Sequence, residues 1–245
     1  MRVAVAGGTG LVGRMVVAAL EREGHTPVVI ARSQGVDLVS GRGLGPALEG
    51  VTAVVDTSNV TTTSRRGSVE FFARATANLL DQATRAGVQH LVVLSIVGID
   101  RVDFGYYEGK RRQEELVRAG SVPHTILRAT QFHEFGQQLL DRMPGPVAVV
   151  PRMRSQPVAA SEVADELVRL TTGPALGDAP ELAGPEVHDM VDLVRRQVRH
   201  NGDRRLVVPA RLPGAVGRAM AGGGLLPTGP GPRGSVTFDE WLAGV

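Results

Sequence analysis

Apolar residues occur along the chain in short runs that alternate with longer stretches of helical periodicity. The first run, Arg2–Ala6, ends in glycines and has the composition of a strand buried on both faces. Apolar residues then recur at helical spacing from Leu11 to Leu20, and Gly24 stands where a C-cap glycine is expected. Thr26–Ala31 is a second apolar run. Together these segments predict a strand–helix–strand unit of about thirty residues, the size of a parallel crossover.

The alternation continues to about residue 130. The pattern predicts a strand at 36–39, a helical turn at 44–49, a strand at 52–56, a helix at 68–86, a strand at 90–95, a helix at 107–119 and a strand at 124–128. Strands that alternate with helices indicate an α/β fold with a doubly wound parallel sheet, which is the Rossmann fold.

The pattern changes after about residue 150. Helices are expected at 161–171 and 188–200, and residues 209–235 are rich in Gly and Pro. A loop that closes over a substrate and a disordered tether fit this Gly/Pro-rich composition equally well. Thr237 and Glu240 have the spacing of a capping box at the start of a terminal helix. We expect residues 1–150 to form an NAD(P)-binding core, and residues 151–245 to complete the same domain on the substrate side.

Composition narrows the classes of protein that are possible. A hydrophobic content of 42% and a charged content of 21% are ordinary for a soluble globular protein. A formal net charge of +2 and 4% aromatic residues argue against a nucleic-acid partner. The chain has no cysteine, and its histidines show no metal-ligand spacing, so no metal is expected. Without a signal-like start or a long apolar run, the sequence predicts a cytoplasmic protein with no membrane partner; monomer and homodimer both stay open.

The stretch "VAVAGGTGLVG" places Gly7, Gly10 and Gly13 between the first predicted strand and helix. Glycine lets the backbone turn sharply and lets a pyrophosphate approach without a Cβ in the way, while the helix start offers free N–H groups. This context predicts a dinucleotide site. The turn and first helical positions, Thr9, Leu11 and Val12, are expected to contact the cofactor as well.

The end of the second predicted strand indicates which dinucleotide binds. NAD-binding sites usually place an acidic residue there to hold the ribose 2′-hydroxyl, but residues 25–36 contain none. The strand leads instead into Arg32 and Ser33, and a guanidinium can bind a 2′-phosphate through charge-assisted hydrogen bonds. The sequence therefore favours NADP(H) over NAD(H), unless Arg32 is only a solvated loop cation.

Five motifs carry a resemblance to a known family: the glycine turn, "GVDL" at 35–38, "VVLS" at 92–95, "YYEGK" at 106–110 and "TILRATQF" at 125–132. With these motifs the chain resembles the atypical short-chain dehydrogenase/reductase family, specifically its NmrA-like, NAD(P)H-binding branch. The likeness covers about residues 1–135 and extends more loosely to the C-terminus.

The resemblance assigns roles within "YYEGK", which holds both tyrosines and the only lysine of the chain. In the family the tyrosine is the acid/base, here Tyr106, and the lysine, here Lys110, holds the nicotinamide ribose and lowers the pKa of the tyrosine. A serine, here Ser95, orients the substrate oxygen; a capping or cofactor-contact role is an equal alternative for it. At i and i+4, Tyr106 and Lys110 would share one helix face, which an ordinary surface pair would also do.

The same resemblance places further residues near the cofactor. Asp37 and Leu38 would border the adenine, Thr57 and Ser58 would approach a ribose, and Ala129 would lie near the nicotinamide. Candidates for the substrate wall, or alternatively packing residues, are Gln131, Phe132, His133 and Phe135. Glu114 is expected to form a helix ion pair.

The resulting hypothesis is an NADP(H)-dependent oxidoreductase that moves a hydride to or from a small carbonyl, alcohol or quinone-like substrate. A first alternative is a non-catalytic NmrA-like redox sensor that binds the dinucleotide without turnover. A second is a nucleotide-sugar epimerase, against which the short C-terminal part and the preference for NADP(H) both count.

Overall fold

The apolar runs of the first half of the chain form strands of one parallel sheet in the computed structural model, which describes residues 1–244. The strands are β1 (Arg2–Ala6), β2 (Thr26–Ile30), β3 (Ala53–Asp56), β4 (His90–Ile96), β5 (His124–Ala129) and β8 (Gly177–Asp178). They lie in the order β2-β1-β3-β4-β5-β8, with parallel pairing. All four residues of β3 are buried, as expected for a strand covered on both faces.

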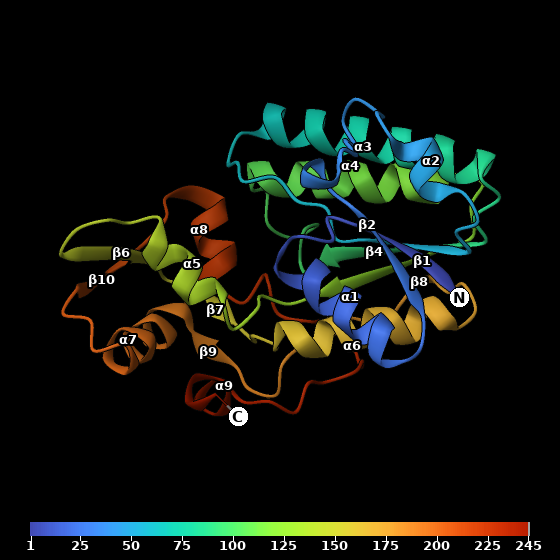
Figure 1. Cartoon of the computed structure of the whole chain (residues 1–245). Coiled ribbons are helices and arrows are strands. Elements are labelled where there is room, and N and C mark those ends of the chain that lie inside the picture. Colours follow the sequence, from blue (N-terminus) through green and yellow to red (C-terminus); the bar gives the residue numbers. More distant parts are fainter. Residues whose placement is uncertain (245) are drawn as a thin grey trace. The chain divides into compact units, whose positions relative to one another are not determined.

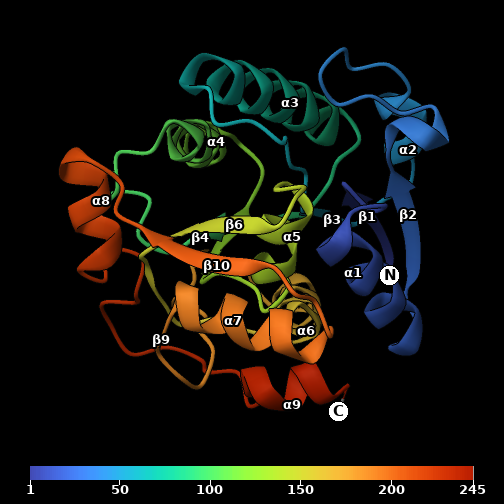
Figure 2. The ribbon, with the colours of Figure 1, turned by 90° about the vertical axis from the view of Figure 1, so that its left-hand side faces the viewer.

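Helices cover both faces of this sheet (Figures 1 and 2). Helices α3 (Arg65–Arg85) and α4 (Gly105–Ala119) lie side by side on one face, while α1 (Leu11–Arg22) and α6 (Ala160–Thr172) lie on the other. The short helices are η1 (Arg32–Gln34) and α2 (Leu44–Leu48). The prediction of a doubly wound Rossmann fold is confirmed.

The strand order fixes where a ligand can bind. From β1 the chain passes to β2 on one side and then to β3 on the other side of β1. In open parallel sheets the crevice at such a reversal, outside the carboxyl ends of the strands, is where ligands bind. Here these ends are Ala6 of β1 and Asp56 of β3, which are register partners.

The chain divides into two compact units that interleave along the sequence. The first unit comprises Met1–Ser95, Phe104–Arg128 and Ser161–Ala179; the second comprises Ile96–Asp103, Ala129–Ala160 and the chain from Pro180 onward. The expected boundary near residue 150 stays a prediction, because no single cut along the chain separates these units. Within residues 1–244, no helix combines the length and apolar character needed to cross a bilayer.

The second unit is built around one amphipathic helix. It contains α5 (Phe135–Asp141), β6 (Val147–Pro151), β7 (Arg154–Ser155), β9 (His188–Asp189), α7 (Met190–His200), β10 (Leu206–Ala210), α8 (Gly214–Ala221) and α9 (Phe238–Ala243). Helix α7 packs against α5 and against the parallel pair β6–β10. The predicted capping box is confirmed, because the Thr237 hydroxyl accepts the backbone N–H of Glu240 and the Glu240 carboxylate accepts that of Thr237.

The strand predicted at 36–39 does not form. The Asp37 carboxylate instead accepts the backbone N–H of Val39, at 2.9 Å, and the Ser40 hydroxyl, at 3.0 Å. The Asn78 amide, from α3, donates to the carbonyls of Leu38 and Val39. These hydrogen bonds hold the segment in a turn, so its backbone groups are not available for pairing with a neighbouring strand.

The Gly/Pro-rich tract at 209–235 is neither all loop nor a disordered tether. Residues 214–221 of this tract form α8. Further along, the backbone of Ala183 is bonded on both sides, because its N–H donates to the Pro232 carbonyl and its carbonyl accepts the N–H of Gly234. These bonds fix the tract to the second unit. A role in covering a substrate stays a prediction.

Candidate functional site

The turn between β1 and α1 is a backbone cradle that only glycine can form. Gly7 has φ +74°, and a Cβ added there would lie 2.9 Å from Cα of Ser58. A Cβ on Gly8 would lie 2.9 Å from the carbonyl oxygen of Val5, and one on Gly13 would lie 2.2 Å from that of Gly7. Real side chains do not fit at such distances, so the cradle keeps a bare backbone surface.

The start of α1 supplies hydrogen-bond donors beside this cradle. Gly10 is the N-cap, and no side chain caps the helix. The first N–H groups of a helix have no intrahelical partner and carry the positive end of its dipole, which favours an anion. Val12 is buried, so this predicted contact residue can offer only its backbone. The exposed Thr9 uses its carbonyl to accept from Arg14.

The turn after β3 closes the cradle from the neighbouring strand. The Thr57 hydroxyl donates to the carbonyl of Ala6 at 2.8 Å. The Ser58 backbone N–H donates to the Asp56 carboxylate at 2.8 Å. The Ser58 hydroxyl is buried and has no hydrogen-bond partner among the described residues. An orphaned buried hydroxyl beside a cradle that a Cβ would fill fits a bound dinucleotide.

The residues expected near the adenosine half of the dinucleotide follow the carboxyl end of β2. Arg32 and Ser33 lie in η1 and are exposed. Asp37 takes part in its own turn, where the Val39 N–H is the first cause that lowers its pKa and the nearby Arg32 is a smaller one. The adenine contact of Asp37 and Leu38 stays a prediction.

Tyr106 stands at the start of α4 and is fixed to the turn after β3. Its hydroxyl donates to Oδ1 of Asn59 at 2.7 Å. Its carbonyl accepts from the Ser68 hydroxyl, and its ring packs edge-on against Phe72 with a centroid distance of 5.9 Å. Burial, followed by the neighbouring Tyr107, raises the pKa of Tyr106. Lys110 is not among the causes of this shift, so a lowering of the Tyr106 pKa by Lys110 stays a prediction.

Tyr107 packs on its own helix end. Its ring makes an edge contact with Phe104 at 5.5 Å, and burial raises its pKa to about 12. Tyr107 is thus a packing residue at the start of α4.

Lys110, the only lysine, lies inside the first unit with 4% of its surface exposed. Its ammonium donates to the carbonyl of Leu94, at 2.7 Å, and to Oε1 of Gln113. It also lies 4.7 Å from the centroid of Phe72. Burial lowers its pKa to about 8, and the charges of Asp56 and Glu114 partly oppose this. Its role as a ribose anchor stays a prediction, since its donors are directed to protein groups.

Ser95 is buried at the end of β4 and bonded to a carboxylate. Its hydroxyl donates to Glu114 at 2.6 Å. Glu114 is 1% exposed and also accepts two bonds from Arg128, at 2.9 and 2.6 Å, and one from Arg118 at 3.0 Å. The expected helix ion pair of Glu114 is present, but it is part of a buried network. Substrate orientation by Ser95 stays a prediction.

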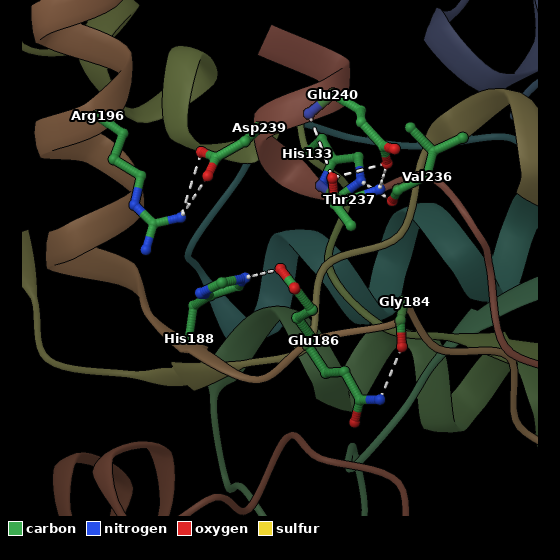
Figure 3. Close-up of polar contacts among 10 residues, drawn as sticks. His133, Gly184, Glu186, His188, Arg196, Val236, Thr237, Asp239 and Glu240 are labelled. Carbon is green, nitrogen blue, oxygen red and sulfur yellow. Dashed lines mark hydrogen bonds and ion pairs between the residues drawn. The ribbon is translucent and has the colours of Figure 1, made fainter. Parts of the chain in front are cut away.

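The candidate residues from Ala129 to Phe135 belong to the second unit. His133 is buried, and its Nε2–H donates to the carbonyl of Val236 at 3.0 Å (Figure 3). Its ring packs against Phe238 and Trp241. The Ser155 hydroxyl donates to Gln131. For His133 and Gln131, these contacts agree with the packing alternative. The contact of Ala129 with the nicotinamide stays a prediction.

Sequence reasoning missed two buried members of the site. Asp56 is 2% exposed and Gln113 is not exposed at all, and the Gln113 amide donates to the Asp56 carboxylate at 2.9 Å. A charged residue as the last position of an apolar strand was the available signal for Asp56. Nothing in the sequence distinguishes Gln113 from a surface residue of α4.

The fold and the glycine cradle define a Rossmann protein of the dinucleotide-binding class. Residues 7–174 match the family model described as NAD(P)H-binding, and the chain belongs to this family. The expected membership of an NAD(P)H-binding family is thereby confirmed.

Two curated proteins and one solved structure show the range of relatives. The photosystem II assembly factor Ycf39 of Synechocystis sp. is 29% identical over 147 residues, which are 54% of this chain and 45% of that protein. The (4-alkanoyl-5-oxo-2,5-dihydrofuran-3-yl)methyl phosphate reductase of Streptomyces griseus is 32% identical over 142 residues, 52% of this chain and 47% of that protein. The chain thus spans about half the length of the curated relatives it matches.

A short-chain dehydrogenase/reductase superfamily protein from Agrobacterium tumefaciens, solved with bound NAD, superposes with a TM-score of 0.70. The match has 21% identity and covers 100% of this chain and 95% of the other. At this identity the likeness shows the fold.

Proposed function

We propose that this protein is an NADP(H)-dependent oxidoreductase that moves a hydride between the nicotinamide and a small carbonyl, alcohol or quinone-like substrate. One observation carries the proposal. The Tyr106 hydroxyl is bonded to Asn59, in the same turn whose Ser58 backbone closes the glycine cradle. A phenol is thus positioned at the edge of the sheet where the dinucleotide fits.

The chain's own residues would divide the work as follows. Bound NADPH supplies the hydride for carbonyl reduction. Tyr106 would supply the proton that the developing alkoxide needs, because a phenol is protonated at neutral pH. Asn59 orients the phenol, and the backbone around Gly7, Gly10 and Gly13 holds the pyrophosphate.

The preference for NADP(H) rests on Arg32. This residue follows β2 and is exposed, and residues 25–36 contain no acidic residue. A guanidinium matches a 2′-phosphate bidentately, whereas a ribose 2′-hydroxyl offers it no charge. The Streptomyces relative, named as a reductase, supports the oxidoreductase assignment.

One observation favours a second candidate, a dinucleotide-binding protein without turnover. The proton of Tyr106 is directed to an amide oxygen, which cannot take it up, and the Lys110 ammonium is not directed to the phenol. The relative named as an assembly factor supports this alternative. Under it, Tyr106 would report on cofactor binding rather than transfer a proton.

One experiment distinguishes the oxidoreductase from the dinucleotide-binding protein without turnover. Binding of NADPH and NADH is measured by fluorescence, and oxidation of each is then followed with a panel of aldehydes, ketones and quinones. The oxidoreductase binds and turns over NADPH with at least one class of acceptor. Tight binding without turnover of any class would favour the non-catalytic alternative.

A further inference from the structure

Three buried side chains, Lys110, Gln113 and Asp56, form a hydrogen-bond relay beneath the candidate site. The Lys110 ammonium donates to Oε1 of Gln113, and Nε2 of Gln113 donates to the Asp56 carboxylate at 2.9 Å. Their exposed fractions are 4% for Lys110, 0% for Gln113 and 2% for Asp56. The Gln113 amide is the neutral link between an ammonium and a carboxylate, and only one orientation of that amide satisfies both.

This hydrogen-bond relay continues into the turn that contacts Tyr106. The second oxygen of Asp56 accepts the backbone N–H of Ser58 at 2.8 Å. Asn59, the next residue, accepts the Tyr106 hydroxyl at 2.7 Å. Since Tyr106 and Gln113 both lie on α4, the path leaves this helix, crosses the end of β3, and returns to the same helix.

We propose that Asp56 and Gln113 are positioning residues, which hold the turn at 57–59 against α4 and thereby set both the Tyr106 phenol and the Ser58 edge of the cofactor cradle. Any catalytic role of the Tyr106 phenol rests on the proposed function. The position of the phenol beside the cradle does not.

The chemistry of the relay explains why it would fix one geometry. Buried polar networks specify a structure strongly when every member is satisfied, and they lose that effect when one link is unpaired. Ser58 is the residue whose Cα lies nearest a Cβ added to Gly7. A small shift of the turn therefore changes both the cradle and the acceptor of the phenol.

The variant Gln113→Glu tests the relay through a property that pH can reverse. As a carboxylate, the new side chain still accepts from Lys110 but repels Asp56; once protonated, it can again donate to Asp56. We expect binding of NADP⁺ to weaken by about 10-fold at pH 8 and to recover to within about threefold of the parent at pH 6. Isothermal titration calorimetry of the full chain with NADP⁺ gives both values.

A second readout follows Tyr106 itself. The chain has two tyrosines, so a Tyr107→Phe background leaves Tyr106 as the one phenol, and its absorbance near 295 nm reports its titration. If Gln113→Glu displaces the turn at 57–59, the Tyr106 phenol becomes exposed. The pKa of Tyr106 then moves down toward the ordinary value. The control Gln89→Glu makes the same change at an exposed position and should alter neither readout.

Each outcome decides between the possibilities. If folded Gln113→Glu matches Gln89→Glu in NADP⁺ affinity and phenol titration, the relay has no positioning role. If circular dichroism shows Gln113→Glu unfolded, Gln113→Asn replaces it; its shorter amide introduces no buried charge but cannot span both partners, and unchanged readouts would overturn the proposal equally. Both readouts are independent of turnover, so an absence of oxidoreductase activity contradicts the proposed function and leaves this test standing.

Discussion

The Tyr106 hydroxyl donates to the side-chain oxygen of Asn59 across 2.7 Å. This bond joins the start of α4 to the turn after β3, next to the residue that closes the glycine cradle. The phenol and the cofactor edge are therefore parts of one structural element. Asn59 can orient the phenol but cannot remove its proton, so under the proposed function a substrate oxygen would have to compete for that proton.

Substitution of Gly13 by Ala should damage cofactor binding and stability together. The new Cβ would lie 2.2 Å from the Gly7 carbonyl oxygen, so the turn must shift. We expect NADPH affinity to fall by about 10-fold or more and the free energy of unfolding to fall by about 1–3 kcal/mol. Fluorescence titration and urea denaturation measure these. Gly229→Ala, where an added Cβ meets nothing within 4 Å, is the control that should change neither.

Substitution of Arg32 by Ala should affect one dinucleotide only. Loss of a charge-assisted contact to a 2′-phosphate should weaken NADPH binding by roughly 10- to 100-fold and leave NADH binding within about twofold. Arg85→Ala, at the exposed end of α3, is the matched control. Equal affinities for both dinucleotides in the parent, unchanged in Arg32→Ala, would show that this residue does not select the cofactor.

The buried Lys110 should give stability a particular dependence on pH. Its folded-state pKa of about 8 lies below the ordinary value of about 10.4, so between these values the unfolded chain holds the extra proton. The contribution of Lys110 to the free energy of unfolding is therefore flat below about pH 8, rises up to about pH 10.4 and is flat again above it. The difference in unfolding free energy between the parent and Lys110→Met isolates this contribution. A difference that falls over this range contradicts the burial of the ammonium.

Breaking the ion pair of Arg128 with Glu114 should lower the free energy of unfolding more than breaking a surface ion pair does. Arg128→Met removes two of the bonds to a carboxylate that is 1% exposed, so we expect a loss of about 3–5 kcal/mol in unfolding free energy. Arg112→Met breaks an exposed pair with Glu115 and should cost at most about 1 kcal/mol. Equal losses for both variants would mean that Glu114 is not held in a buried network.

The first crossover and the glycine turn could be predicted because their signals are local. The bounds of β1 match the apolar run, and Gly24, with φ +76°, follows the end of α1 as expected. The positions of Tyr106 and Lys110 on one helix face also follow from their spacing, and both side chains contact the Phe72 ring. In each case, neighbours in sequence decide the geometry.

The remaining features depend on distant partners. The segment at 36–39 turns because Asn78, about forty residues later, bonds its carbonyls. Strand β6 pairs with β10 from a segment nearly sixty residues away, and neither strand was predicted. Helical spacing gives the face on which Lys110 lies but not its depth, so its bonds to Leu94 and Gln113 appear only in the folded chain.

The proton-donor role of Tyr106 is tested most simply by the variant Tyr106→Phe, assayed for both NADPH affinity and turnover with the acceptor that the parent reduces. Removal of the hydroxyl takes away the proton donor but leaves the glycine cradle intact. We expect kcat to fall by about 100-fold or more, with the Kd for NADPH within about threefold of the parent. Turnover at the parent's rate would contradict the assignment of Tyr106 as the acid.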